Sequence, residues 1–482
     1  MQKAPCLLAL DQGGHASRAF LWSATGELLA QHEVAVATRR IGEDRVEHDA
    51  GELLATLRHA IDVVLVRAPP GQQVLAGLAT QRSSIVAWDR DSGLPLSPVL
   101  SWQDRRNARW LEGLRAQESR IRALTGLPLT AHYGASKMRW CLQHLDALGP
   151  VQANGTLVLG PLSSYLVQGL CGGAPRVDPA NASRTQLWDI ATRDWSSELL
   201  SLFGIDARCL PQSVDSDADF GEIRGVSTAT RLRLVTGDQS TVPFLFGPPS
   251  SEDIFVNLGT GAFVQRATGA EPVHLAGLLS SILCSGRLGT HFCVEGTVNG
   301  AGSATALVAK GLGRDEPGLW RDLESAAAIV PVPYFNAVSG LGSPFWASHL
   351  HSGFLGDGSP LQHFAGVVES IAFLLAANVI AMRVMNPAPQ RVVLTGGLSR
   401  SGWLCQRLAD LLGGPVTVPS VREATVHGLR QMLGVDSTLV AAATTDYPPR
   451  DNPALRARYE RWLDELAGRG IRAAITSSTQ LG

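Results

Sequence analysis

The chain has 482 residues, a formal net charge of −2, 45% hydrophobic residues and 17% charged residues. A single hydrophobic core rarely grows beyond roughly 250 to 300 residues, so this length predicts a globular protein of two domains. The near-zero charge, without a basic run interleaved with aromatic residues, excludes the usual patterns for binding nucleic acid or an anionic membrane. Small-molecule chemistry is therefore the favoured class of function.

Three features of the sequence indicate a cytoplasmic protein. The apolar segment before Asp11 is too short for a signal peptide. The long apolar segment Ile371–Met382 is interrupted by Asn378, which indicates a core helix rather than a membrane span. Seven cysteines are scattered without CxxC pairs, so we expect reduced thiols in the core.

Strands come first in each half of the chain, and helices follow. Apolar segments at about 6–10, 17–22 and 28–34 predict a strand meander, after which Gly51–Val66 has the apolar spacing of a helix. Asp49 and Glu52 are placed to form a capping box for that helix. Two further buried strands are expected at Val74–Ala79 and Ser84–Asp89.

The second half repeats this order. The expected elements are strands near 254–258, 262–266, 280–284 and 291–295, helices to about 385, a strand at 392–396, a helix from Ser401, and a charged helix after Pro448. Proline, glycine and serine cluster at Gly247–Asp253, which indicates a hinge between the halves. We therefore expect domains at 1–247 and 248–482.

Each half begins with a glycine-rich hairpin, one after Asp11 and the other at Gly259. In both, an apolar strand enters a glycine turn whose backbone N–H groups can hold phosphate. One such hairpin is usually an ordinary tight turn. Two of them, 248 residues apart, favour nucleotide binding between two domains.

Nine short motifs carry a resemblance that covers nearly the whole chain. They are Asp11–Ala19, Arg45–Asp49, Thr80–Ser84, Ser101–Arg106, Asn181–Ile190, Gly237–Gln239, Gly259–Phe263, Gly340–Trp346 and Thr395–Ser401. In this order they resemble the FGGY family of carbohydrate kinases, and most of all its glycerol kinases. The resemblance implies an α/β fold of two actin-like (ribonuclease H-like) domains with a nucleotide and substrate cleft between them.

The resemblance also implies an activity. It is the transfer of the γ-phosphoryl group of ATP, with Mg²⁺, to a terminal hydroxyl of a small polyol or sugar. Asp238 matches the general base, which accepts the proton of the attacking hydroxyl. Asp11 matches the aspartate that holds Mg²⁺, with Asp238 as a second metal ligand. From the residues alone, each aspartate could equally cap its own turn. A homodimer or homotetramer is the assembly that the family suggests.

Two further sets of residues take their roles from the resemblance. The nucleotide-binding positions are Gly13, Gly14, His15, Arg18, Gly259, Thr260, Gly261, Gly396 and Gly397. The substrate-binding positions are Arg82, Ser83, Trp102, His132, Asp238, Gln239 and Phe263. Arginine pairs with neighbouring hydroxyls, and aromatic faces contact C–H groups. Trp102 and Phe263 could also be core aromatics, and Arg82 a buried ion-pair partner. Arg105 and Arg106 are interpreted as a solvated or structural pair.

The chain departs from the glycerol kinase pattern in two places. Ser83 stands where a glutamate is usual, and His132 where a tyrosine is usual, which removes a charge-assisted acceptor worth about 1.5–3 kcal/mol. A pentulose or a tetritol is therefore an alternative substrate. In the first hairpin, Gly14 and His15 replace two threonines, so hydroxyl donors are lost. His15 either contacts phosphate when protonated or fills the loop.

Two functions of other classes stay open. A nucleotide- and sugar-binding regulatory protein without kinase activity would fit the altered first hairpin, although Asp11 and Asp238 oppose it. An actin-like ATPase acting on protein partners is the other, and Arg82, Trp102 and Gln239 oppose it, because a polyol pocket explains them.

Overall fold

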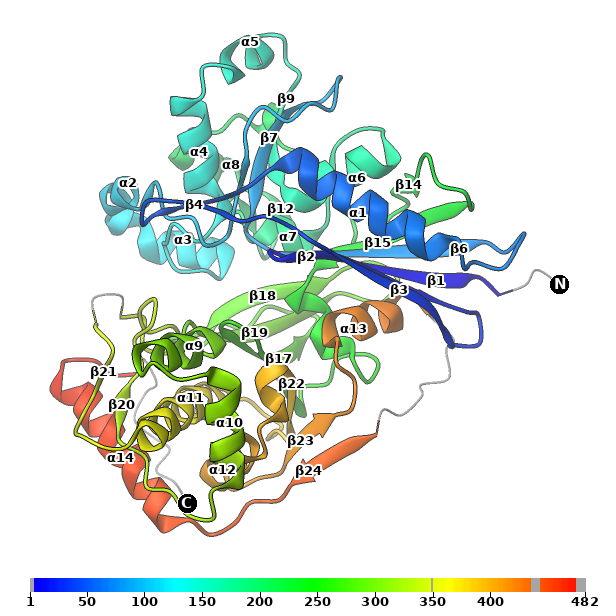
Figure 1. Cartoon of the computed structure of the whole chain (residues 1–482). Helices are drawn as coiled ribbons and strands as arrows, with labels where there is room; N and C mark the ends of the chain where they lie inside the picture. Colours follow the sequence, from blue (N-terminus) through cyan, green and yellow to red (C-terminus); the bar gives the residue numbers. More distant parts are fainter. Residues whose placement is uncertain (1–3, 348–349, 435–442, 474–482) are drawn as a thin grey trace.

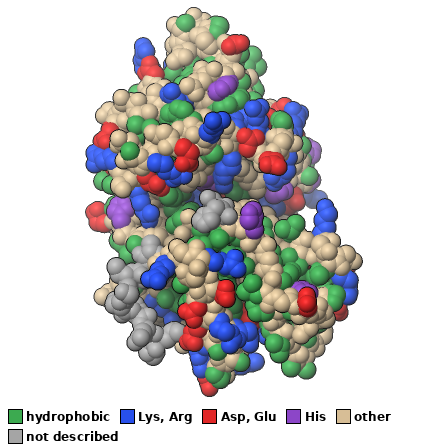
Figure 2. All heavy atoms as spheres, turned by 90° about the vertical axis from the view of Figure 1, so that its left-hand side faces the viewer, with side chains coloured by type: hydrophobic (Ala, Val, Ile, Leu, Met, Phe, Trp, Pro, Cys, Tyr) green, Lys and Arg blue, Asp and Glu red, His purple; other side chains and the backbone are tan. Residues whose placement is uncertain are grey.

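Two domains, each built on a central mixed sheet, make up the protein (Figure 1). The structure is a computed structural model, which describes residues 4–347, 350–434 and 443–473. Figure 2 shows one face of the molecule, where Lys and Arg side chains alternate with Asp and Glu side chains among the described residues. No extended patch of one sign covers the described part of that face.

The N-terminal domain contains a six-stranded sheet in the order β14-β15-β6-β1-β2-β3. Its strands are β1 (Cys6–Gln12), β2 (Ala16–Trp22), β3 (Leu28–Ala35), β6 (Val74–Thr80), β14 (Gly221–Glu222) and β15 (Thr230–Gly237). β1 and β2 are antiparallel, whereas β1, β6 and β15 run parallel. Helix α1 (Ala50–Leu65) contacts β1, β2 and β3 with its apolar side.

The C-terminal domain contains a seven-stranded sheet in the order β18-β19-β17-β16-β22-β23-β24. Its strands are β16 (Asp253–Leu258), β17 (Ala262–Gly269), β18 (Leu279–Cys284), β19 (His291–Val298), β22 (Arg391–Gly396), β23 (Val416–Pro419) and β24 (Thr444–Tyr447). The five strands β19-β17-β16-β22-β23 have the same order and directions as β3-β2-β1-β6-β15. The two sheets therefore repeat one topology, as the doubled sequence predicted.

A third sheet covers one end of the N-terminal domain. It contains β4 (Arg39–Ile41), β5 (Arg45–His48), β8 (Val99–Leu100), β7 (Ile85–Asp89) and β9 (Leu157–Pro161). Around it are α2 (Ala108–Leu111), η1 (Glu112–Gln117), α3 (Glu118–Thr125), α4 (Gly134–His144), α5 (Leu148–Ala153), α6 (Leu162–Cys171), α7 (Pro179–Ser183), α8 (Ser197–Phe203) and η2 (Ala207–Cys209). The strand expected at Ser84–Asp89 thus forms, but outside the main sheet.

The remaining elements are short strands, the short helix η3 that follows β15, and the helices of the C-terminal half. The strands form two-stranded pairs, β10 (Arg176–Val177) with β13 (Gln212–Ser213), β11 (Trp188–Asp189) with β12 (Asp194–Trp195), and β20 (Tyr334–Phe335) with β21 (Gly353–Phe354). The helices are η3 (Gln239–Phe244), α9 (Gly302–Gly311), α10 (Glu316–Ser325), α11 (Pro360–Met382), η4 (Gly397–Arg400), α12 (Gly402–Leu412), α13 (Ala424–Leu433) and α14 (Pro453–Gly468).

Helix α11 is the one described helix that is long and apolar enough to cross a membrane. In its most apolar stretch, 94% of the residues are buried inside the protein. The helix packs against β17, β19, α9 and α12, so it is the central helix of the C-terminal core. The core helix expected at Ile371–Met382 is therefore confirmed.

Two other local expectations have different outcomes. All seven cysteines are buried and unpaired, as expected. The capping box of α1 forms only in part. Asp49 accepts a hydrogen bond from the amide of Glu52, but Glu52 turns its carboxylate to the amide of Ala37 at 3.0 Å. The carboxylate of Glu52 therefore bonds to Ala37, which follows β3, and not to the backbone amide of Asp49 as a complete capping box requires.

Helix α13 lies in the C-terminal half of the sequence but packs on the N-terminal sheet (Figure 1). Leu429 and Val426 join a core cluster with Ala9 and Ala79 from β1 and β6. The helix also contacts η3 closely, since a Cβ on Gly428 would lie 2.1 Å from the carbonyl oxygen of Thr241. α13 therefore joins the two halves and supports the short helix that follows β15.

Candidate active site

Three parallel strands of the N-terminal sheet end at the same edge and place three functional residues there. Asp11 on β1 is in register with Ala79 on β6, and Gly237 on β15 is in register with Thr80. Because parallel strands present their carboxyl ends at one edge, the residues that follow converge. Asp238 comes directly after β15 and lies near enough to Asp11 for its charge to act on that carboxylate, and Arg82 follows β6 after one intervening residue, Gln81.

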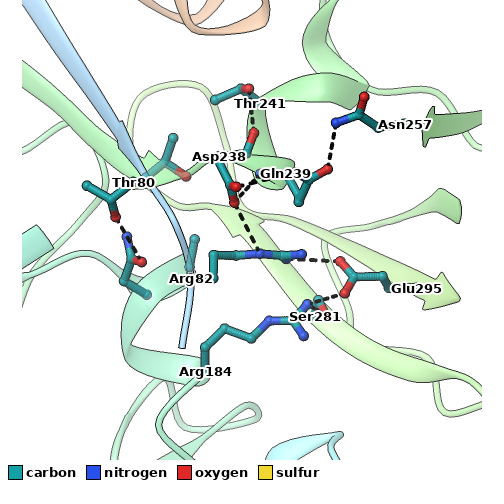
Figure 3. A network of polar contacts seen from close by, with 12 residues as sticks. Thr80, Arg82, Arg184, Asp238, Gln239, Thr241, Asn257, Ser281 and Glu295 are labelled. Carbon is teal, nitrogen blue, oxygen red and sulfur yellow. Dashed lines mark hydrogen bonds and ion pairs between the residues drawn. The ribbon is translucent and has the colours of Figure 1, made fainter. Parts of the chain in front are cut away.

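Asp238 is held by its own helix and by the neighbouring strand (Figure 3). Its amide donates to the carbonyl of Thr80 at 2.8 Å. Its carboxylate accepts hydrogen bonds from the amide of Gln239 at 2.7 Å and from its Nε2 at 3.3 Å, and Arg82 Nε lies 3.8 Å away. The side chain keeps 24% of its exposure. Burial raises the pKa of Asp238, and the positive charge of Arg82 opposes this rise.

A buried ion-pair network joins the two domains beside Asp238. Glu295 on β19 is fully buried and accepts hydrogen bonds from Arg82 at 2.9 Å, Arg184 at 2.7 Å and Gln265 at 3.0 Å. Burial alone would raise the pKa of Glu295, but the two arginines hold it below its usual value. Arg82 also lies over the ring of Phe263 at 5.4 Å. The guanidinium of Arg82 is thereby fixed between Asp238 and Glu295.

Gln239 connects Asp238 to the second sheet (Figure 3). Its Oε1 accepts a hydrogen bond from Asn257 on β16 at 2.9 Å. The amide oxygen of Asn257 in turn accepts from Thr395 Oγ1 on β22 at 3.2 Å. A continuous chain of hydrogen bonds therefore runs from the carboxylate of Asp238 to the end of the central parallel pair of the C-terminal domain.

Asp11 is 5% exposed and pairs with Arg18 across the first hairpin at 3.2 Å. Arg18 also binds Glu33 at 2.6 Å, so its guanidinium is shared between two carboxylates. Burial raises the pKa of Asp11 to about 7, the charge of Arg18 opposes this, and the charge of Asp238 adds to it. The two aspartates thus repel each other and favour a cation between them.

A second group of residues lies around Trp102. The rings of Trp102 and His132 are 5.6 Å apart, and both side chains are partly exposed. Buried Lys137 donates to the carbonyls of Ser83 at 3.0 Å and His132 at 2.6 Å, and so joins these two positions. Ser83 has φ of 64°, and its buried hydroxyl has no partner among the described residues. A polar substrate group could supply that partner.

The glycines of the first hairpin differ physically from Gly261 of the second hairpin and from Gly396 at the end of β22. A Cβ on Gly261 would lie 2.8 Å from the carbonyl oxygen of Val298, and one on Gly396, which has φ of +87°, would lie 2.3 Å from that of Leu258. Neither can carry a side chain without moving the backbone. At Gly13 and Gly14 the nearest atoms would be 3.5 and 3.4 Å from a Cβ, and at neither residue is φ positive. The protein itself therefore does not require glycine in the first hairpin.

The residues present fit a nucleotide. Among the described residues, the amides of Gly14 and Gly261 have no hydrogen-bond acceptor. The atom nearest to a Cβ on Gly14 is Oε1 of Gln81, whose side chain is 3% exposed and whose two polar atoms have no described partner. The unsatisfied buried side-chain amide of Gln81 points to an absent polar ligand. The amide of Gly14 is partly exposed and can donate to a phosphate, which binds through backbone N–H groups.

The residues also fit a magnesium ion. The described residues contain no group of three or more His, Cys, Asp or Glu side chains that could enclose a metal. Mg²⁺ needs no such cage, because it keeps several waters and is held by one or two carboxylates together with substrate phosphates. Asp11 and Asp238 supply two oxygen ligands of the kind that Mg²⁺ prefers.

Two domains of one topology, with a polar site at their junction, define the class as two-domain α/β proteins of the actin-like fold. The FGGY family of carbohydrate kinases matches the chain over residues 6–247 for its N-terminal domain and 254–432 for its C-terminal domain. The chain therefore belongs to the FGGY family of carbohydrate kinases and is a phosphotransferase. The resemblance inferred from the nine motifs is confirmed.

Curated relatives are similar over most of their length. A glycerol kinase of Citrifermentans bemidjiense is 35% identical over 461 residues, which are 90% of this chain and 92% of the relative. A glycerol kinase of Thermus brockianus is 33% identical over 485 residues, which are 97% of each chain.

Solved structures share the fold. A Plasmodium falciparum glycerol kinase with ADP has a TM-score of 0.86 at 21% identity and covers 97% of this chain and 99% of its own. A ligand-bound xylulose kinase of Lactobacillus acidophilus has a TM-score of 0.80 at 17% identity, with coverage of 96% and 98%. At this identity the likeness shows the fold, and the predicted fold class is confirmed.

The sequence did not single out four residues of the site. Glu295, Arg184 and Asn257 link the domains around Asp238, and Gln81 lies beside the first hairpin. A signal existed for Asn257, because it occupies the same place before the second hairpin as Asp11 before the first. The only sequence signal for Glu295 was that it is a charged residue within an otherwise mostly apolar segment.

Proposed function

We propose that the protein transfers the γ-phosphoryl group of MgATP to a terminal hydroxyl of a small polyol or sugar, with Asp238 as the general base. The observation that carries this proposal is the placement of Asp238, a partly exposed carboxylate at the domain junction, next to Arg82 and Gln239. Phosphoryl transfer needs positioning and charge neutralisation more than covalent chemistry from the protein. The site offers both.

In this reaction the substrate oxygen attacks the γ-phosphorus, and the bond from that phosphorus to the bridging oxygen of ADP breaks. The hydroxyl proton passes to Asp238, and ADP leaves with the electron pair of the broken bond. The raised pKa of Asp238 suits this role, since a base works best with a pKa moved toward the working pH. Gln239 and Arg82 hold the carboxylate in one orientation.

The two hairpins serve the nucleotide in this proposal. The backbone N–H groups of Gly14 and Gly261 donate to the phosphates, and the unpaired side-chain amide of buried Gln81 lies beside Gly14. Gly259 and Thr260 belong to the second hairpin and contribute to the same phosphate cradle, whereas Gly396 and Gly397, at the end of β22, would lie at the adenosine end of ATP. Mg²⁺ held by Asp11 and Asp238 would neutralise negative charge on the transferring phosphoryl group.

Arg82, Trp102, His132 and Phe263 form the walls for the polyol or sugar. Arg82 donates to neighbouring hydroxyls, and the aromatic rings contact C–H groups. We expect a cytoplasmic enzyme, because all seven cysteines are unpaired. We also expect a homodimer or homotetramer, as the family resemblance suggested.

A coupled ADP-release assay tests the proposal. MgATP is combined in turn with glycerol, tetritols, pentitols, ketopentoses and ketohexoses, and Asp238→Asn serves as the blank. ADP release that depends on one of these compounds and is absent in the blank supports a kinase. ATP binding without release across the panel favours the regulatory alternative, and release stimulated by a peptide but by no polyol favours the ATPase alternative.

A further inference from the structure

The first glycine hairpin is held from outside by the segment that follows β3. Thr38 Oγ1 donates to the carbonyl of Gly14 at 3.0 Å, and the amide of Val36 donates to the carbonyl of His15 at 2.9 Å. Among the described residues, no group other than the Thr38 hydroxyl donates to the Gly14 carbonyl. The orientation of this carbonyl therefore depends on one side chain.

The hydrogen bond from Thr38 also fixes the direction of an N–H group. The carbonyl of Gly14 and the N–H of His15 belong to one planar trans peptide unit, in which the two groups point in opposite directions. Because Thr38 holds the carbonyl on its own side, the N–H of His15 is directed away from Thr38. This N–H has no acceptor in the part of the chain that the structure describes. The first hairpin thus presents an oriented donor that the protein itself does not use.

Gly14 by itself would not keep this peptide in one orientation. Glycine has no Cβ to restrict its backbone, and a Cβ at this position would meet no atom closer than 3.4 Å. A flip of the peptide would exchange the directions of the Gly14 carbonyl and the His15 N–H. A carbonyl oxygen would then replace a donor, and it would repel a phosphate.

Thr38 has a rigid support, because both backbone groups of the preceding residue are bound. The amide of Ala37 donates to the carboxylate of Glu52 in the first turn of α1 at 3.0 Å. The carbonyl of Ala37 lies 3.0 Å from Nδ1 of buried His48 on β5, and since a carbonyl can only accept, the imidazole donates. Glu52 leaves the capping box for this contact. Two elements therefore fix the segment that carries Thr38.

The second hairpin orients its peptide with backbone groups instead. The carbonyl of Thr260 accepts from the amides of Ala301 at 3.1 Å and Ser303 at 3.0 Å, and also from Ser303 Oγ at 3.0 Å. A carbonyl oxygen has two lone pairs, so the two amides suffice without the hydroxyl. By the same peptide geometry, the N–H of Gly261 is directed away from these donors. The two hairpins thus differ in what they require, which is a hydroxyl in the first and backbone amides in the second.

We propose that Thr38 is a positioning residue for nucleotide binding, which holds the Gly14 peptide so that the N–H of His15 donates to a phosphate of ATP. This inference rests on one part of the proposed function, the binding of ATP phosphates by the first hairpin. Thr38 lies outside the nine motifs of the sequence, and it acts through the backbone of the hairpin without contacting the nucleotide.

Calorimetric titration of the full-length protein with ATP tests the proposal. Thr38→Val keeps the shape of the side chain and removes the hydroxyl, so the Kd for ATP should rise about five- to tenfold, the equivalent of one hydrogen bond. Thr38→Ser keeps the hydroxyl and should bind ATP nearly as the native protein does. The melting temperature of Thr38→Val should fall by no more than about 4 °C.

Steady-state kinetics separate positioning from a general structural role. In Thr38→Val the KM for ATP should rise by the same factor as the Kd, while the KM for the phosphorylated polyol or sugar stays unchanged. Ser303→Ala is the matched control, because it also removes a hydroxyl that bonds a hairpin carbonyl but leaves the two amides in place. It should change the affinity for ATP less than about twofold.

The outcomes that contradict this inference differ from those that contradict the kinase. Unchanged ATP affinity in Thr38→Val, or an equal loss in Thr38→Ser, overturns the role of Thr38 and leaves the kinase intact. A native protein that binds ATP but phosphorylates no compound of the panel contradicts the kinase alone, and the titrations still decide the role of Thr38. A native protein that binds no ATP overturns both.

Discussion

Asp11 and Asn257 occupy the same position in the two domains, since each lies near the end of the central strand, before a glycine hairpin. Both side chains turn toward the residues after β15. Asp11 is coupled to Asp238 by charge, whereas Asn257 donates a hydrogen bond to Gln239 at 2.9 Å. One topology thus offers a charged group on one side of the site and a neutral amide on the other.

The difference shows how a doubled fold becomes asymmetric. In the proposed reaction a cation with phosphates needs negative ligands, and the carboxylate at the N-terminal position can supply one. The C-terminal position donates to Gln239 and accepts from Thr395, and an asparagine amide can do both. The same contrast extends to the hairpin glycines, which the backbone requires at Gly261 and does not require at Gly14.

The largest effect is expected for Asp238→Asn. This substitution removes the carboxylate on which Asp11 acts by charge and to which Asn257 is linked through Gln239. Turnover should fall by about 10²–10⁴, because general-base catalysis contributes that much, while nucleotide binding persists. Steady-state kinetics and calorimetric titration with ATP measure the two effects. Asp217→Asn, at a carboxylate that pairs with Arg287, is the control. Near-normal turnover in Asp238→Asn would remove the proposed base.

Exchanging the two equivalent residues tests the asymmetry directly. Asp11→Asn should lower kcat about 100-fold and raise the Mg²⁺ concentration needed for half-maximal rate, since a metal ligand is lost. Asn257→Asp should lower kcat/KM only about tenfold, because Gln239 loses a hydrogen-bond donor. Exposed Asn154→Asp controls for added charge. An unchanged Mg²⁺ requirement in Asp11→Asn would argue against a metal at this position.

Gly396 at the end of β22 and Gly14 in the first hairpin should separate effects on stability from effects on binding. Gly396→Ala should lower the free energy of unfolding by about 1–3 kcal/mol, because alanine is strained at φ of +87°. Gly14→Ala should leave the melting temperature within about a degree and weaken ATP binding about tenfold, because the side chain fills space meant for phosphate. Thermal unfolding and ATP titration of both variants measure this. Equal destabilisation by the two substitutions would contradict the distinction.

The smallest effect concerns pH. Burial raises the pKa of Asp11 from its ordinary 3.8 to about 7 in the folded protein. Its contribution to stability is therefore full at pH below 4 and is lost as the pH rises toward 7. Without Mg²⁺ and nucleotide, Asp11→Asn should melt a few degrees higher than the native protein at pH 8 but not at pH 4. A constant difference across this range would show that Asp11 does not titrate near neutrality.

Much of the site could be predicted from the sequence because its residues follow strands. Asp11, Arg82 and Asp238 each come directly after a short apolar segment, and parallel strands bring such positions together. The two glycine-rich hairpins likewise predicted that the two sheets would repeat one topology. These signals are local. A short apolar segment predicts a strand, and the direction of that strand alone determines where the residue at its end lies.

The charge balance of the site could not be predicted. Glu295 binds Arg82 and Arg184, which lie 213 and 111 residues away in sequence. No sequence pattern near Glu295 predicts these two partners. The capping box of α1 was half wrong for a similar reason, since Glu52 took the amide of Ala37 instead of its local partner. The pairing of Arg106 with both Glu47 and Asp104 could not be predicted either, because Glu47 lies 59 residues away in sequence.

By itself the sequence determined the two-domain α/β fold, the family, the two glycine hairpins and the strand ends that carry Asp11 and Asp238. The period of the apolar residues, the spacing of the glycines and short motifs encode these features within a few residues. Only the tertiary structure decided that α13 supports η3 across the domain junction, that Lys137 joins Ser83 to His132, and that Glu295 binds Arg82 and Arg184. Compensation of buried charge depends on contacts between distant segments, and no local pattern records them.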